Sequence, residues 1–392
     1  MNPPVPSMAS TDLAREWSIV HILSMWYRDH HRRLPWRETR DPYRIWVSET
    51  MLQQTRVETV IPYYHAFLER FPDVAALAAS DEEAVLKCWQ GLGYYSRARN
   101  LHRAARLVVE RHGGRIPDDP RAFLALPGVG AYTAGAVMSI AFHRPIPAVD
   151  GNVLRVVARL ENLCDPVDHP TVRRRIERLV EGWLQQAEPA VFTQALMELG
   201  AVVCTPRSPR CGACPVRSAC RAHRAGTAED LPKRAPKRPR RQKVVLALWC
   251  ETGEGVVVEQ RPADGLLGGM WQLPAHELDA DALDAPSDAG RDAESGGAAE
   301  AAGPVRRALM DCLQRVFPGT ACHAVRFVEV ARERHVFTHL EWSVRLFRPE
   351  GMPAGARVDR TRFRVVCRDE LGGLPWPRVY EKLISGALQM LI

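Results

Sequence analysis

The sequence lacks any run of about 18 consecutive apolar residues, and this absence predicts that no helix spans a membrane. Its first eleven residues lack a basic start followed by an apolar run, so we do not expect a secretory signal. No long internal repeat is present. The 392 residues are 46% hydrophobic and 25% charged, which is typical of a soluble globular protein. We therefore expect a cytoplasmic protein with two domains.

Positive charge is concentrated in one short segment. Residues 231–243 hold seven Lys and Arg and no acidic residue, whereas residues 1–230 carry a net charge of +4 and residues 244–392 carry −4. This segment also mixes proline with charge and offers nothing to bury, so it predicts an extended linker between two domains. Its charge fits either a polyanionic partner or a solvated charge run.

The apolar pattern changes at this linker. Before it, helical spacing predicts helices over residues 17–27, 47–67, 81–90, 96–111, 133–142, 153–163, 172–185 and 192–203. After it, β-branched and aromatic runs predict strands over residues 244–249, 255–260, 325–330, 340–347 and 362–366. Residues 276–303 are rich in Ala, Asp, Glu, Ser and Gly, and this composition predicts a flexible insertion. We expect a helical domain over residues 1–230 and an α/β or α+β domain over residues 244–392.

Four of the ten cysteines lie within 17 residues, in the spacing C-x6-C-x2-C-x5-C. They are Cys204, Cys211, Cys214 and Cys220. In a reducing compartment such spacing favours a metal site over disulfides. Four thiolates can hold a tetrahedral zinc ion or a [4Fe–4S] cluster, and the spacing leaves both open.

A glycine-containing turn and two carboxylates are further candidates. Gly128 and Gly130 lie in a turn between two predicted helices, where the backbone can approach a DNA phosphate closely; a plain helical hairpin is the alternative. Asp150 directly precedes a predicted helix, a position typical of an N-cap. Glu49 lies among apolar residues of another predicted helix, which favours a raised pKa. Each carboxylate alone is typical of a structural role.

Together, the hairpin, Asp150 and the cysteine spacing resemble the helix-hairpin-helix, iron–sulfur DNA glycosylases related to endonuclease III. Residues 46–55 and 91–101, and a C-terminal domain containing residues 265–274 and 337–339, are similar to the adenine glycosylases of that group. The resemblance covers nearly the whole chain except the first dozen residues and the acidic insertion. It implies an all-α glycosylase domain containing a six-helix barrel, a [4Fe–4S] cluster in the loop 204–220, and an α+β Nudix-like C-terminal domain.

The resemblance also implies roles in base excision. Glu49 corresponds to the general acid that protonates adenine at N7, and Asp150 to the group that stabilises the oxocarbenium-like sugar or forms a transient adduct with it. Tyr132 and Asn152 would orient this pair. Tyr132 stands where the bifunctional lyases of the group carry a Schiff-base lysine, and a phenol cannot form an imine, so we expect a monofunctional enzyme.

The duplex hides the glycosidic bond, so we expect the adenine to be flipped out. By the same resemblance its pocket would be lined by Arg37, Leu52, Val57, Gln194 and Met197. The gap in the base stack would be filled or wedged by Gln54 and Tyr94, with Leu92 beside them. Leu154 stands where some relatives carry a lysine near the catalytic Asp.

Residues 265–274 resemble the start of a Nudix domain, but no Arg-Glu-x-x-Glu-Glu-x-Gly helix follows Pro274. We therefore expect this domain to recognise and not to hydrolyse. The resemblance implies that it senses 8-oxoguanine through Phe337, Thr338 and His339, where Thr338 replaces the usual Ser.

The expected partner is double-stranded DNA with an 8-oxoguanine:A or G:A mispair, bound by a monomer. The alternatives are a glycosylase with β-lyase activity on oxidised pyrimidines and a catalytically silent DNA-binding protein. Nucleotide hydrolysis is disfavoured by the missing acidic helix.

Overall fold

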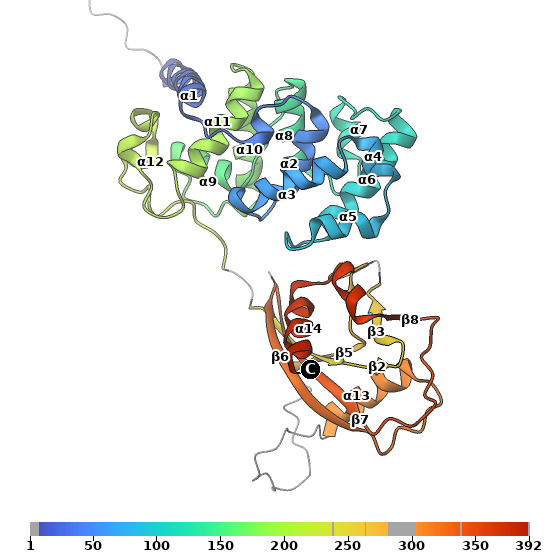
Figure 1. The fold of residues 1–392 in the computed structure, drawn as a ribbon. Helices are drawn as coiled ribbons and strands as arrows, with labels where there is room; N and C mark the ends of the chain where they lie inside the picture. The colour runs from blue at the N-terminus through green and yellow to red at the C-terminus, as the bar shows by residue number, and fades with distance from the viewer. Residues whose placement is uncertain (1–7, 237–238, 263, 281–302, 338, 391–392) are drawn as a thin grey trace, which may run out of the picture. The chain divides into compact units, whose positions relative to one another are not determined.

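A computed structural model describes residues 8–236, 239–262, 264–280, 303–337 and 339–390 (Figure 1). Two compact units are present: the first consists of residues 1–80 and 97–236, and the second of residues 81–96 and 237–392. Within the described residues, no helix combines the length and apolar composition needed to cross a membrane.

The first unit is built from helices, as the sequence predicts. Its elements are α1 (Met8–His30), η1 (Pro35–Arg37), α2 (Pro42–Leu52), α3 (Val57–Arg70), α4 (Val74–Ala79), α6 (Ser96–His112), α7 (Pro120–Leu124), α8 (Ala131–Phe142), α9 (Gly151–Leu160), α10 (Pro170–Leu184), α11 (Pro189–Val202), η2 (Cys211–Ala213), η3 (Arg217–Ala219) and α12 (Arg221–Arg224). The helix α5 (Glu82–Trp89) belongs to the second unit.

One predicted helix, over residues 47–67, is wrong: the chain forms two helices there. The first, α2, ends at Leu52, and Gln54 adopts a left-handed backbone conformation with φ of 61°. A residue in that conformation cannot continue a right-handed helix. The second helix, α3, then begins at Val57. Residues 53–56 are all polar, but the apolar spacing on either side of them is helical, so periodicity alone did not mark the break.

The core of the first unit forms around α11. This helix contacts α1, α8, α9 and α10, and its buried Phe192, Leu196 and Leu199 pack in one cluster with Leu23 of α1 and Val157 of α9. α2 packs separately against α8 and α3. Because α8 contacts both α2 and α11, residues distant in sequence can share one cavity.

The second unit has two four-stranded sheets. Its strands are β1 (Arg241–Leu248), β2 (Glu251–Thr252), β3 (Gly255–Gln260), β4 (Trp271–Gln272), β5 (Ala275–Asp279), β6 (Arg326–Val336), β7 (Leu340–Glu350) and β8 (Phe363–Val366), and its further helices are η5 (Arg368–Gly373), α13 (Gly303–Val316) and α14 (Arg378–Met390). One sheet has the order β5-β1-β7-β6, with β1 parallel to β7; in the other, β3 pairs with β2, β4 and β8.

Alternation along β1 shows how the core of the second unit is arranged. Val245 and Ala247 pack in a cluster that includes α14, whereas Leu246 and Leu248 pack in a cluster that includes α13. Successive strand residues point to opposite faces, so the two helices cover opposite faces of this sheet. The α+β prediction for this part of the chain is confirmed.

Two predicted boundaries differ in the structure. Residues 276–279, assigned to the insertion over 276–303, lie in β5, which pairs with β1. Residues 241–243, assigned to the linker over 231–243, lie in β1. In both cases strand pairing overrides a composition typical of loops. Residues 281–302 of the predicted insertion lie outside the described residues.

Candidate active site

Glu49 lies on α2, a helix that is almost entirely buried. The helix begins at Pro42, and the carboxylate of Asp41 caps it by accepting a 2.8 Å hydrogen bond from the Tyr43 N–H. Glu49 is only 5% exposed, and the adjoining helical turns contain buried Trp46. Burial of a lone carboxyl disfavours its charged form.

Tyr132, in the first turn of α8, is the hydrogen-bond partner of Glu49. Its hydroxyl donates a 2.6 Å bond to Glu49 Oε2. Burial raises the pKa of Glu49 to about 7, although the Tyr132 bond lowers it; the charge of Asp150 raises it further, and Arg37 lowers it. Burial and the Glu49 charge raise the pKa of Tyr132 well above its usual value, so the phenol remains the donor.

Asp150 is the N-cap of α9, as its position in the sequence predicts. Oδ1 accepts a 2.7 Å bond from the Val153 N–H, and Oδ2 accepts a 2.8 Å bond from the Asn152 side-chain amide. Burial raises the pKa of Asp150, while these bonds and the charge of Arg155 act to lower it. The bonds to both oxygens stabilise the ionised form of the carboxylate.

These groups line one cavity of about 300 Å³. It contains all four predicted catalytic residues and all five predicted base-contacting residues: Glu49, Tyr132, Asp150, Asn152, Arg37, Leu52, Val57, Gln194 and Met197. They come from η1, α2, α3, α8, α9 and α11. The structure therefore brings together residues spread over about 160 positions of sequence.

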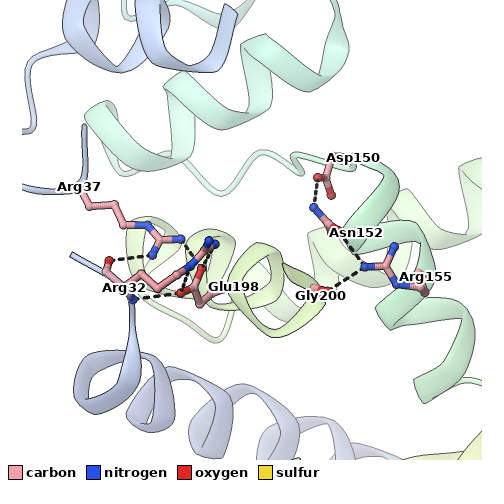
Figure 2. Close-up of polar contacts among 7 residues, drawn as sticks. All are labelled: Arg32, Arg37, Asp150, Asn152, Arg155, Glu198 and Gly200. Atoms are coloured by element: carbon pink, nitrogen blue, oxygen red, sulfur yellow. Dashed lines mark hydrogen bonds and ion pairs between the residues drawn. The ribbon is translucent and has the colours of Figure 1, made fainter. Parts of the chain in front are cut away.

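Sequence reasoning missed Arg32 and Glu198, which line the same cavity. Glu198 is fully buried on α11 and accepts hydrogen bonds from both Arg32 and Arg37 (Figure 2). One sequence feature could have identified it: Glu198 is the single charged residue between positions 189 and 202. Glu49 shows the same feature, a single carboxylate in a mainly apolar stretch of helix.

Arg155, one turn along α9, holds Asn152 in place. Its Nη2 donates 2.8 Å bonds to Asn152 Oδ1 and to the Gly200 carbonyl (Figure 2). Its Nε donates a 2.8 Å bond to the carbonyl of Cys204. A Cβ on Gly200 would lie 2.6 Å from the Asn152 Cβ, so only glycine permits this approach of α11 to α9.

The predicted stack-filling residues lie in turns. Gln54 is exposed, in the left-handed turn between α2 and α3. Tyr94 is 46% exposed and has a φ of 48°, whereas Leu92, two residues earlier, is buried. A bulky exposed aromatic side chain on a tight turn is suited to inserting between bases. Gln54 belongs to the first unit and Tyr94 to the second.

The predicted hairpin connects α7 to α8. Gly128 has a φ of 75°, and a Cβ there would lie 2.5 Å from the Asn100 Cβ. Gly130 is the N-cap of α8, has an ordinary φ of −94°, and is exposed. The first N–H groups of α8 lack a side-chain cap, an arrangement that suits an anion such as a phosphate.

The four clustered cysteines line one largely apolar hollow that α9, α11 and the loop 204–220 enclose. Within the described residues, no group of three His, Cys, Asp or Glu side chains is placed to hold a single metal ion. Four thiolates around one hollow are a donor set that an iron–sulfur cluster uses. Arg159 Nη1 lies 3.3 Å from Cys204 Sγ and supplies positive charge beside these ligands.

In the second unit, Phe337 and His339 lie at the turn between β6 and β7. The Phe337 N–H donates a 2.7 Å bond to the Leu340 carbonyl, and its ring lies 5.2 Å from the Trp342 ring, between centroids. Phe337 is half-buried and His339 is exposed. Thr338 lies outside the described residues.

Comparison with known families gives three matches along the chain. Residues 47–182 match the HhH-GPD superfamily of base excision DNA repair proteins. Residues 204–220 match the iron–sulfur binding domain of endonuclease III, and residues 244–386 match the NUDIX domain.

Individual proteins are similar over much of this length. The adenine DNA glycosylase of Mus musculus is 34% identical over an alignment of 390 positions, gaps included, and the match covers 86% of this chain and 71% of the mouse protein. The adenine DNA glycosylase of Rattus norvegicus is 36% identical over 71% of this chain, and the match spans 64% of the rat protein. The solved structure of a thermostable thymine-DNA glycosylase is 30% identical, with a TM-score of 0.50, over 55% of this chain and 99% of that chain.

Proposed function

Because this chain belongs to the adenine DNA glycosylases of the HhH-GPD superfamily, we propose that it removes adenine mispaired with 8-oxoguanine in duplex DNA, and more slowly adenine opposite guanine, without cutting the strand. The observation that carries this proposal is the cavity that Glu49 and Asp150 line together, with the Tyr132 hydroxyl bonded to Glu49. A proton donor and a carboxylate that stabilises positive charge are the two groups that N-glycoside hydrolysis requires.

Glu49 supplies the proton. Adenine is a poor leaving group until a ring nitrogen is protonated, and N7 is the position we assign. A carboxyl whose pKa is about 7 is protonated in half of the molecules at neutral pH and can still release its proton in the transition state. Desolvation by α2 and its neighbours is the largest cause of this pKa.

Asp150 stabilises the sugar that remains. Departure of the base leaves oxocarbenium character on the deoxyribose, and an anion beside C1′ lowers the energy of that state. The bonds from Val153 and Asn152 hold the Asp150 carboxylate in a fixed orientation. Water then completes the hydrolysis, either directly or by displacing Asp150 from a transient adduct.

The absence of an amine from the cavity supports a monofunctional reaction. Among the described residues lining the cavity, the cationic side chains are those of Arg32, Arg37 and Arg56, and none is a lysine. A guanidinium stays protonated in proteins and does not form an imine. The Tyr132 hydroxyl, already bonded to Glu49, cannot do so either.

Entry to the cavity requires the adenine to leave the base stack, because its glycosidic bond is inaccessible in a duplex. We assign Gln54 and Tyr94 to the gap that the flipped base leaves. Gly128 and Gly130 would bind the DNA backbone at the start of α8. Contacts of Gly128 and Gly130 to the DNA backbone carry no base information, so they do not recognise the base opposite the adenine.

We assign that recognition to residues 244–392. The helix α13, which packs against the NUDIX-like sheet, carries one acidic residue, Asp311, and so lacks the carboxylates that a hydrolase needs for its metal ions. We propose that Phe337, Thr338 and His339 recognise 8-oxoguanine. His339 is exposed at the β6–β7 turn, where it can contact a base.

The chain holds a [4Fe–4S] cluster through Cys204, Cys211, Cys214 and Cys220. When bound, the cluster ties the loop 204–220 into a fixed shape. The chain's own contribution is to connect this loop to α9: Arg155 bonds to the Cys204 carbonyl and Arg159 bonds to that of Thr205. Both arginines lie on the helix that Asp150 caps.

A strand-cleavage assay tests the proposal. A short duplex with one 8-oxoguanine:A pair, labelled on the adenine strand, is incubated with the protein and divided into samples with and without alkali. We expect a break at the adenine after alkali only. A break without alkali, together with borohydride trapping of the protein on DNA, would show a lyase. Retained binding with no break in either sample would show a silent DNA-binding protein.

A further inference from the structure

Three charged residues form a closed group at one wall of the cavity: Glu198 of α11, and Arg32 and Arg37 from the segment between α1 and α2 (Figure 2). Glu198 Oε1 accepts bonds from the Arg32 backbone N–H at 3.0 Å and from Arg32 Nε at 2.9 Å. Oε2 accepts bonds from Arg32 Nη2 at 2.8 Å and from Arg37 Nη2 at 2.7 Å. Arg37 Nη1 donates to the Arg32 carbonyl at 3.0 Å, which closes the group.

Burial of this charged group carries a high desolvation free energy. Glu198 has no exposed surface, and the hydrogen bonds from both arginines help to hold its pKa at about 2 against the effect of burial, so it is ionised. The desolvation cost of a buried ion pair often equals or exceeds its attraction, and apolar residues of similar volume stabilise a fold equally well. Stability therefore does not explain why a carboxylate and two guanidiniums lie here.

The position of the group suggests an explanation. Arg37 lines the same cavity as Glu49, and its positive charge lowers the Glu49 pKa. Glu198 lies one helical turn after Gln194, which also lines the cavity. The two bonds of Arg37 use two of its five N–H groups, so the remainder can donate to the acceptor edge of a base.

We propose that Glu198 is a positioning residue for adenine excision: it fixes Arg37 in the wall of the base cavity and cancels its charge there, so that Arg37 donates to the flipped base while Glu49 keeps its proton. This inference rests on the proposed function, because it assigns Arg37 to the base. Without Glu198, two uncompensated guanidiniums would face the cavity and favour the ionised form of Glu49.

Other charged groups also act on Glu49, and they set the background for a test. Tyr132 of α8 donates to Glu49, and Asp150 at the start of α9 adds negative charge. Arg56 and Glu58, at the start of α3, line the cavity with opposite charges. None of these groups is altered by a substitution at position 198, so a change in Glu49 can be attributed to the group around Glu198.

The test is an NMR titration of the full-length protein labelled with ¹³C in its glutamate carboxyls. The Glu49 resonance is assigned by its loss in Glu49→Gln. We expect Glu198→Gln to lower the Glu49 midpoint by about one pH unit, the lower end of the effect of an uncompensated opposite charge. Arg32→Met, which leaves Glu198 with one guanidinium, should raise that midpoint. The matched control is Glu188→Gln, at the exposed pair with Arg28 at the start of the same helix, and it should leave the midpoint unchanged.

The adenine-release rate of the same proteins separates this inference from the proposed function. We expect the Glu198→Gln rate to fall about tenfold at alkaline pH and less at acidic pH, because a one-unit shift changes the protonated fraction tenfold above both midpoints. Midpoints that match those of the unaltered protein in both Glu198→Gln and Arg32→Met would overturn the inference. If Glu198→Gln does not fold, an unchanged Glu49 midpoint in Arg32→Met is by itself sufficient to overturn the inference. An unaltered protein that releases no adenine would overturn the proposed function, and the titration would still report on Glu198.

Discussion

Replacing Tyr132 by phenylalanine should extend adenine release to higher pH. The Tyr132 hydroxyl donates a 2.6 Å hydrogen bond to Glu49 Oε2, and this bond is stronger when Glu49 is ionised. The bond therefore lowers the Glu49 pKa, against the larger effect of burial, which raises it. Tyr132→Phe removes the bond and leaves the burial, so Glu49 should keep its proton to a higher pH.

The size of the shift follows from the type of bond. A hydrogen bond to a charged group contributes about 1.5 to 3 kcal/mol. At about 1.4 kcal/mol per pH unit, its loss should raise the Glu49 pKa by about 1 to 2 units, starting from about 7. The alkaline limb of the rate profile should move upward by the same amount.

The assay is the second-order rate constant for adenine release at subsaturating enzyme, measured as a function of pH, because this constant reports the free enzyme. The readout is the pH at which the alkaline limb falls, and not the rate itself, because loss of an orienting group would lower the rate equally at every pH. The matched control is Tyr43→Phe, which removes a hydroxyl that donates a buried bond from the same α2 helix to the Phe71 carbonyl. A Tyr132→Phe limb at the same pH or lower would refute this account of Glu49.

Three further outcomes are expected. Glu49→Gln should become more stable relative to the unaltered protein as pH rises from 4.5 to about 7, by about 3 kcal/mol in total, because over this range Glu49 ionises more readily in the unfolded chain than in the fold. Denaturant unfolding at several pH values measures this difference in the free energy of unfolding. A difference that does not change with pH would contradict it. Gly200→Ala should slow adenine release, because its Cβ would lie 2.6 Å from the Asn152 Cβ. The control Gly182→Ala places a Cβ in open space and should leave the rate unchanged. Equal rates in the two variants would count against the role of Asn152. Cys204→Ser should lose the visible absorption of the iron–sulfur cluster, and a spectrum unchanged in the purified variant would remove Cys204 from the ligand set.

Much of the fold follows from apolar periodicity. The pattern predicted α6, α8, α9, α10 and α11 of the first unit to within three residues at each end, but it did not predict α4, α7 or α12. It failed between α2 and α3, where a single left-handed residue, Gln54, interrupts an apolar pattern that continues on both sides. It also missed β5, whose residues form a strand only because β1 lies beside them. Such pairing is a tertiary effect that local composition does not encode.

The candidate site, like the fold, could be predicted only in part from the sequence. Asp150 could be predicted as an N-cap from its place before an apolar helix, and Glu49 as a buried acid from its neighbours. The bond between Glu49 and Tyr132 joins positions 83 residues apart, so no local pattern reveals it. The local sequence marks Glu198 only as a single charge in an apolar helix, and its partner Arg37 lies 161 residues away, so the pattern does not predict their bond.

The central claim is that Glu49 protonates adenine in the cavity that it shares with Asp150. The most direct test is a single-turnover measurement of adenine release from an 8-oxoguanine:A duplex by the unaltered protein and by Glu49→Gln, with duplex binding measured in parallel. Glu49→Gln should bind the duplex as tightly as the unaltered protein and release adenine at least about a hundredfold more slowly, since a general acid usually contributes at least that factor. Release at the same rate by both proteins, with equal binding, would contradict it.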